Sequence, residues 1–219
     1  MTWTEHVDGY CERIDPGFWA EPVNAVTNAA FVIAALVMAY RLRTTHAPLA
    51  WILTSVLGLI GIGSFLFHTF AQPWAGVLDV VPIVAFILIY IFAASRDFLG
   101  LPTLWSLGIM VAFLPLSAAL IPVFQSIPLY GHSAGYLLVP VFIAIYAILL
   151  RTNPALSRGL AIGAALLMLS LTFRSLDMPL CDTLPLGTHF LWHILNAVML
   201  AWMIEIYRRH RLAPPAPQG

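Results

Sequence analysis

The sequence contains no lysine, and all ten of its basic residues are arginines. Without a lysine amine the chain cannot hold retinal or another carbonyl compound as a Schiff base, which excludes a retinal protein. Charge is scarce as well, because only 9% of the 219 residues are charged and ten acidic residues balance the ten arginines. No basic excess is left to attract a nucleic acid, so DNA and RNA binding are excluded.

Apolar residues are abundant instead. They make up 61% of the chain, against roughly 45–50% in an average soluble domain, which predicts an integral membrane protein. The first 22 residues have no basic stretch followed by an apolar core, and they carry five carboxylates, so they do not resemble a cleavable signal peptide. A lysine-free composition rich in alanine and arginine is typical of GC-rich bacteria, and we expect a bacterial plasma membrane protein.

Seven stretches are apolar enough to cross a hydrocarbon core about 30 Å thick, which requires roughly 20 residues per helix. They cover residues 23–40, 49–70, 75–94, 103–124, 134–150, 158–173 and 187–207. The sequence therefore predicts an all-α membrane protein, a seven-transmembrane-helix bundle that forms one domain over residues 1–219. An acidic N-terminal segment (1–22) precedes the bundle (23–207), and a tail (208–219) follows, of which residues 212–219 are expected to be disordered.

The arginines divide unevenly between the two sides of this bundle. Arg13 and Arg174 fall on one side, and the other eight fall on the opposite side. The positive-inside rule then predicts a cytoplasmic C-terminus and a non-cytoplasmic N-terminus. Cys11 and Cys181 lie on the non-cytoplasmic side, where a disulfide can persist. We predict that they are bonded, the alternative being two unrelated free thiols. Arg174 and Asp177 are expected to form a local ion pair.

Few polar residues lie within the predicted spans, and five of them share one depth. Ser64 and His68 stand four residues apart near the end of the second helix, and His189 and His193 repeat this spacing at the start of the seventh. Asp79 lies near the start of the third helix. Residues at i and i+4 share a helix face, and the topology brings all five toward the non-cytoplasmic leaflet.

These residue types predict a zinc hydrolase. Three imidazoles from two helices can bind zinc and leave a fourth position open for water, whose pKa zinc lowers to about 7. Asp79 can take the proton of that water, and Ser64 can donate a hydrogen bond to a developing oxyanion. The implied reaction is hydrolysis of an ester or amide. Each motif alone has another interpretation, because intramembrane histidines can join helices through hydrogen bonds and a small serine can permit close packing.

The N-terminal segment offers a second candidate metal site. Asp8, Glu12, Asp15 and Glu21 provide hard oxygen ligands of the kind that calcium prefers. A merely solvated acidic segment is the alternative, since the spacing of an EF-hand is absent. Polar residues near the start of the first helix are expected to hydrogen-bond neighbouring helices; these are Asn24, Thr27 and Asn28.

Six motifs together resemble the alkaline ceramidase family. They are GIGSFLFH at 61–68, Asp79 followed by Pro82, HFLWH at 189–193, Cys11 with Glu12, EPVNAVTN at 21–28 and RSLDMPLC at 174–181. That family belongs to a group of seven-helix membrane hydrolases that also includes the adiponectin receptors. The resemblance implies that His68, His189 and His193 bind zinc, with Asp79 as the base and Ser64 as the oxyanion-side helper. It also implies a disulfide between Cys11 and Cys181 and a calcium site with Glu12 and Glu21, to which Asp8 or Asp15 contributes.

The resulting hypothesis is a zinc-dependent intramembrane amidase. It cleaves the N-acyl bond of ceramide or a similar membrane lipid to a sphingoid base and a fatty acid. Three alternatives remain: a non-catalytic seven-helix receptor or metal-binding scaffold, a hydrolase acting on another N-acyl lipid, and an intramembrane serine protease. The protease would pair Ser64 with one histidine and no metal, which leaves two histidines and Asp79 unexplained.

Overall fold

The computed structural model describes residues 2–212 and contains helices and no strands in that range. The main helices are α1 (Pro22–Thr27), α2 (Ala29–Leu42), α3 (Pro48–Phe70), α4 (Pro73–Ala93), α5 (Thr103–Gln125), α6 (Leu138–Leu149), α7 (Pro154–Leu176) and α8 (His189–Leu212). Three short elements complete the described chain: the π-helical η1 (Ala94–Phe98) and the 3-10 helices η2 (Gly131–Tyr136) and η3 (Met178–Leu180). The disordered end predicted at 212–219 lies almost wholly outside the described residues.

Six helical stretches are long and apolar enough to cross a membrane, which marks a multi-pass membrane protein by length and composition. They are Pro22–Leu42, Pro48–Phe70, Pro73–Phe98, Thr103–Gln125, Pro154–Leu176 and His189–Leu212. Four of these stretches begin with a proline. Proline suits the first helical turn, because an N–H group there would have no acceptor within the helix.

The fifth predicted span differs from the expectation. Residues 134–150 were expected to form one helix, but α6 has only 12 residues and follows the 3-10 helix η2. Gly131 and Gly135 disfavour an α-helix over η2. Pro140 has no N–H to donate to a preceding carbonyl, so it stands in the first turn of α6, where none is required.

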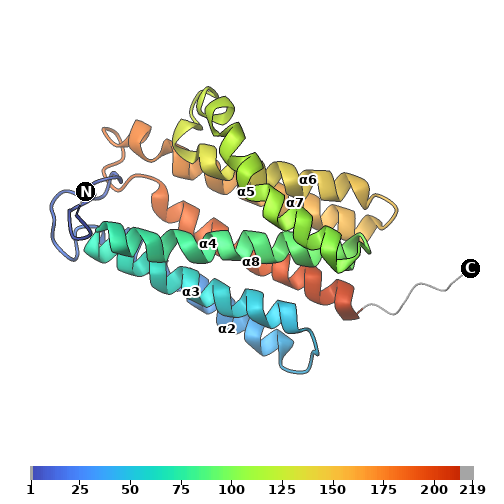
Figure 1. The fold of residues 1–219 in the computed structure, drawn as a ribbon. Coiled ribbons are helices and arrows are strands. Elements are labelled where there is room, and N and C mark those ends of the chain that lie inside the picture. The colour runs from blue at the N-terminus through green and yellow to red at the C-terminus, as the bar shows by residue number, and fades with distance from the viewer. Residues whose placement is uncertain (1, 213–219) are drawn as a thin grey trace, which may run out of the picture.

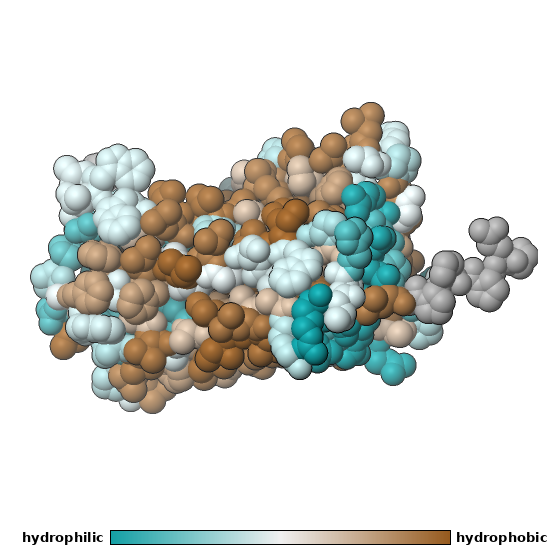
Figure 2. Space-filling model, turned by 90° about the horizontal axis from the view of Figure 1, so that it is seen from below, coloured by the Kyte–Doolittle hydropathy of each residue, from teal (hydrophilic) through white to brown (hydrophobic). Residues whose placement is uncertain are grey.

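Helix α8 is the central element of the bundle. It packs against α7, α2 and α3, whereas α3 packs against α2 and α4, and α6 against α7. Helix α5 lies on the outside with few buried residues and packs against α4 and η2, and in the view of Figure 1 it crosses in front of α7. Apolar side chains cover the middle of the molecule, and polar ones gather toward the end where α8 finishes (Figure 2).

The chain segments that cover the opposite end come from distant parts of the sequence. The N-terminal segment and the loop between η3 and α8 lie together there (Figure 1). A disulfide between Cys11 and Cys181 joins them, with the two Cα atoms 5.4 Å apart. The covalent link therefore fixes the N-terminal segment over the start of α8.

Candidate metal centre

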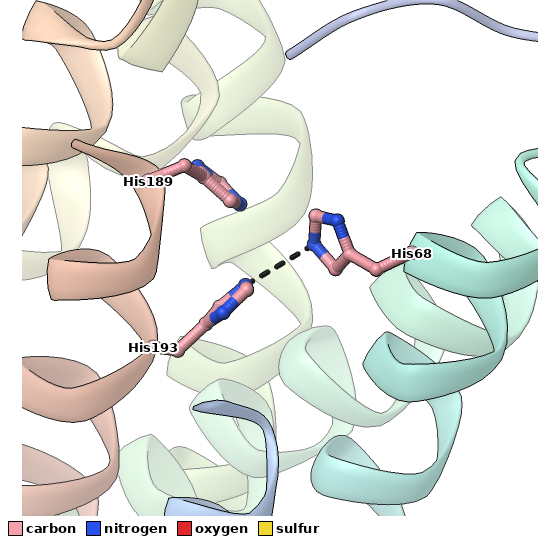
Figure 3. Close-up of side chains that lie close together, drawn as sticks. All are labelled: His68, His189 and His193. Atoms are coloured by element: carbon pink, nitrogen blue, oxygen red, sulfur yellow. Dashed lines mark hydrogen bonds between the residues drawn. The ribbon is translucent and has the colours of Figure 1, made fainter. Parts of the chain in front are cut away.

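Three histidines from two helices converge beneath the N-terminal segment. His68 comes from the last turns of α3, and His189 and His193 come from the first turns of α8 (Figure 3). One ring nitrogen of each lies within 4.8 Å of the others, and the Nε2 atoms of His68 and His193 are 3.1 Å apart. All three side chains are buried. Over residues 2–212, no other group of three His, Cys, Asp or Glu side chains is placed to hold an ion.

Two neighbours bear on which nitrogen His68 and His193 present. The Nδ1 atom of His68 lies 2.6 Å from a carboxylate oxygen of Glu21, which can only accept, so Nδ1 carries the proton. Thr27 donates its hydroxyl proton to the Val23 carbonyl, 2.7 Å away. Its oxygen can then accept a bond from Nδ1 of His193 at 2.9 Å. With these tautomers, which a bound metal ion would require, both rings present an unprotonated Nε2 to the centre of the group.

This donor set fits a tetrahedral metal ion. Two nitrogens that each lie 2.0–2.1 Å from such an ion are separated by about 3.3 Å, close to the distance between the Nε2 atoms of His68 and His193. Neutral imidazoles are ligands that zinc and similar transition metals accept. The carboxylate–histidine and hydroxyl–histidine pairs are the outer contacts that commonly orient such ligands. The three histidines can therefore hold a metal ion.

The start of α8 is fixed by Asp177. One oxygen of its carboxylate accepts the backbone N–H groups of Thr188 and His189 at 2.8 and 2.9 Å, and the other accepts that of Cys11 at 3.0 Å. Gly187 precedes this cap with φ +61, and a Cβ there would lie 2.1 Å from the carboxylate. The prediction of an ion pair between Arg174 and Asp177 is wrong. Asp177 caps α8 because unpaired N–H groups and the helix dipole attract a carboxylate.

Arg174 instead binds the segment before α6. Its guanidinium donates to the carbonyl of His132 at 2.7 Å and lies over the rings of Tyr136 and Trp192. His132 itself is exposed. Arg174 therefore ties the segment around η2 to the same end of the bundle.

Ser64 and Asp79 lie beside the histidines without joining them as ligands. The Asp79 carboxylate lies within interaction range of the Ser64 hydroxyl and of the His68 ring. Helices α3 and α4 approach each other closely at this point. A Cβ atom added at Gly63 of α3 would lie only 2.0 Å from the Leu78 carbonyl of α4. A hydroxyl and a carboxylate are thus available next to the metal centre.

The four acidic candidates for calcium are not brought together. Asp8 and Asp15 are exposed, and Asp15 accepts the N–H of Gly17. Glu12 is buried and accepts the N–H groups of Val23 and Asn24 at the start of α1. Glu21 is buried between Arg13 and His68. Burial tends to raise the pKa of Glu21, but its bonds to His68 and Arg13 outweigh that effect and lower it.

Tyr10 is a neighbour of the metal centre that the sequence did not reveal. Its ring stacks on His189 with 4.0 Å between ring centroids and lies 4.9 Å from that of His68. Burial raises the pKa of its phenol, so the hydroxyl is neutral at physiological pH. Its signal in the sequence was only its position next to Cys11, whose disulfide places it there.

An apolar pocket lies inside the bundle along α8. It lies among α4, α6 and α8, and its wall includes Phe86, Tyr90, Phe142, Tyr146, Trp192 and Met203. Trp192 adjoins His193 in the chain, and Met203 lies about 16 Å further along the helix at a rise of 1.5 Å per residue. The wall of the pocket is almost entirely apolar, and Asn196 is one of its few polar residues.

Comparison with known protein families gives a match over most of the chain. The family model described as Ceramidase matches residues 10–216, a range that includes every residue of the metal centre and both cysteines. No curated protein matches the chain. The family match confirms the resemblance predicted from the sequence motifs.

Proposed function

The chain belongs to the ceramidase family, and on that premise we propose that it is a zinc-dependent amidase. Its substrate is ceramide or a similar N-acyl lipid, which it cleaves to a sphingoid base and a fatty acid. The observation that carries the proposal is the convergence of His68, His189 and His193. A carboxylate and a hydroxyl lie near them, and an apolar pocket runs along the same helix α8.

The chemistry divides among residues with separate tasks. Zinc held by the three histidines would supply a Lewis acid for the amide carbonyl and for the attacking water. Asp79 accepts the proton of the water as its oxygen attacks the carbonyl carbon. Ser64 donates a hydrogen bond to the carbonyl oxygen as its negative charge develops. When the C–N bond breaks, Asp79 passes the proton to the leaving nitrogen, which gives an amine and a carboxylic acid.

The surroundings suit a substrate that arrives from the bilayer. The pocket wall from Trp192 to Met203 is apolar apart from Asn196, and we propose that part of a hydrocarbon tail lies against it while the amide stands at the histidines. Burial of that tail supplies roughly 0.8 kcal/mol per CH₂ group, which holds the amide at the reacting residues.

We further propose a seven-span topology with an outward-facing metal centre. The six residues of η2 and the twelve of α6, taken end to end, amount to about 30 Å at 2.0 and 1.5 Å per residue, enough for the hydrocarbon core. Arg41, Arg208 and Arg209 surround Glu205 at the end of the bundle opposite the histidines. The excess of arginine at that end supports a cytoplasmic location for it.

The test is fatty-acid release from a panel of N-acyl lipids by detergent-purified protein, with Asp79→Asn as the matched variant. The amide is isosteric with the carboxylate but cannot act as a base. We expect the wild type to release fatty acid and the variant to lose about 10²–10⁴-fold in rate while it retains zinc. Zinc without release from any lipid would contradict the proposal and favour a non-catalytic scaffold.

A further inference from the structure

A buried arginine links the N-terminal segment to the metal centre. The Arg13 side chain is only 3% exposed, and its Nε atom lies 2.5 Å from Oε1 of Glu21. The second carboxylate oxygen of Glu21 binds Nδ1 of His68. The guanidinium also donates to the backbone carbonyl of His68 at 3.0 Å. Arg13 therefore acts on His68 in two ways. It binds the backbone carbonyl directly, and it binds the carboxylate of Glu21 that holds the ring.

The second contact caps helix α3. The carbonyl of His68 belongs to the last turn of α3, where carbonyls lack partners within the helix. A cation at this terminus is favoured by the helix dipole. Arg13 thus fixes both the end of α3 and the ring orientation of the histidine that this end presents.

The oxygens around the guanidinium are of the kind that a calcium ion takes. They comprise one carboxylate oxygen of Glu21 and the carbonyls of Asp15, Gly17 and His68, at 2.5–3.4 Å from guanidinium nitrogens. Calcium needs six to eight such oxygens, but these four already bind a permanent cation. Both oxygens of Glu12 are occupied by backbone N–H groups. The residues present therefore do not fit calcium.

We propose that Arg13 is a positioning residue that serves as the built-in cation of the N-terminal segment. It holds Glu21 and the end of α3 in place for His68, so the segment requires no calcium ion. The positioning of a zinc ligand rests on the proposed function, whereas the absence of a calcium requirement does not.

The first experiment uses the wild-type protein and calcium alone. Thermal unfolding and zinc affinity are measured in millimolar CaCl₂ and in a calcium-selective chelator, and calcium binding is measured directly with the radioactive ion. We expect no stoichiometric binding and no shift in either property. Stoichiometric calcium binding, or loss of zinc affinity in the chelator, would overturn the proposal.

The second experiment compares Arg13→Met with Arg43→Met. Arg43 is exposed at the other end of the bundle and contacts the Tyr40 ring, so its variant controls for the loss of an arginine. Zinc affinity is measured by competition with a chromophoric chelator, and the visible spectrum of the cobalt-substituted protein reports ligand geometry. We expect Arg13→Met to lose about 10–100-fold in zinc affinity and to change the cobalt spectrum, while Arg43→Met changes neither.

A double variant tests the route through Glu21. If Arg13 acts partly through this carboxylate, Arg13→Met should cost less zinc affinity in a Glu21→Gln background than in the wild type. Equal costs in both backgrounds, or unchanged zinc affinity in Arg13→Met, would overturn the positioning role. If the wild type binds no zinc at all, the proposed function fails, and the calcium experiment still tests this site.

Discussion

At the scale of single residues, His68 and His193 can each present Nε2 to a metal ion because Nδ1 can donate a hydrogen bond to a neighbour. The acceptor is Glu21 for His68 and Thr27 for His193. The sequence predicted the histidines, because an i, i+4 pair within an apolar span is conspicuous. It predicted only that Thr27 would hydrogen-bond a neighbouring helix, and it assigned Glu21 to calcium. The contacts of Glu21 and Thr27 with the histidines depend on which side chains meet between different parts of the chain. The spacing of residues along one helix does not determine this.

Replacing Thr27 by valine tests this outer contact at the residue scale. The substitution keeps the shape of the side chain and removes the hydroxyl that accepts from His193. We expect a loss of about 10–100-fold in metal affinity, measured by chelator competition. Thr69→Val is the matched control, because Thr69 bonds only to carbonyls of its own helix. Equal metal affinity in the two variants would contradict the role assigned to Thr27.

At the scale of the elements, the close approach of α3 and α4 brings Ser64 and Asp79 together. The sequence predicted both helices within a few residues of their observed bounds, since apolar stretches bounded by Pro and polar residues define them. It did not predict where the two backbones touch. That contact is at Gly63, where a Cβ would collide with the Leu78 carbonyl.

We therefore expect Gly63→Ala to be destabilising by about 1–3 kcal/mol or more, because neither backbone is free to move aside. Thermal unfolding in detergent measures the effect. Gly108→Ala serves as the control, since that position on α5 has no atom within 4 Å of an added Cβ. It should leave stability unchanged or slightly raised. A stable Gly63→Ala protein would refute the assigned helix contact.

At the scale of the whole molecule, composition alone predicted a helical membrane protein, and the six long apolar helices agree with that prediction. The fifth span was less predictable. Its apolar residues continue without a break, but Gly131, Gly135 and Pro140 give a 3-10 helix followed by a short α-helix. The topology of seven spans, with the histidines on the non-cytoplasmic side, stays a prediction.

The absence of lysine permits a direct test of this orientation. Thr183→Lys and Thr152→Lys each introduce a single side-chain amine at an exposed loop position, one before α8 and the other before α7. A membrane-impermeant amine reagent is applied to intact cells, and labelled peptides are identified by mass spectrometry. We expect labelling at Thr183→Lys in intact cells and at Thr152→Lys only after lysis. The reverse pattern would contradict an outward-facing metal centre.

The whole account depends on a metal ion held by the three histidines, and metal content tests this most directly. Elemental analysis is performed on purified wild-type protein, His193→Ala and His132→Ala, the last removing an exposed imidazole that is not part of the group. We predict one zinc ion per chain in the wild type and in His132→Ala, and little or none in His193→Ala. Equal zinc in all three proteins, or none in the wild type, would contradict the assignment.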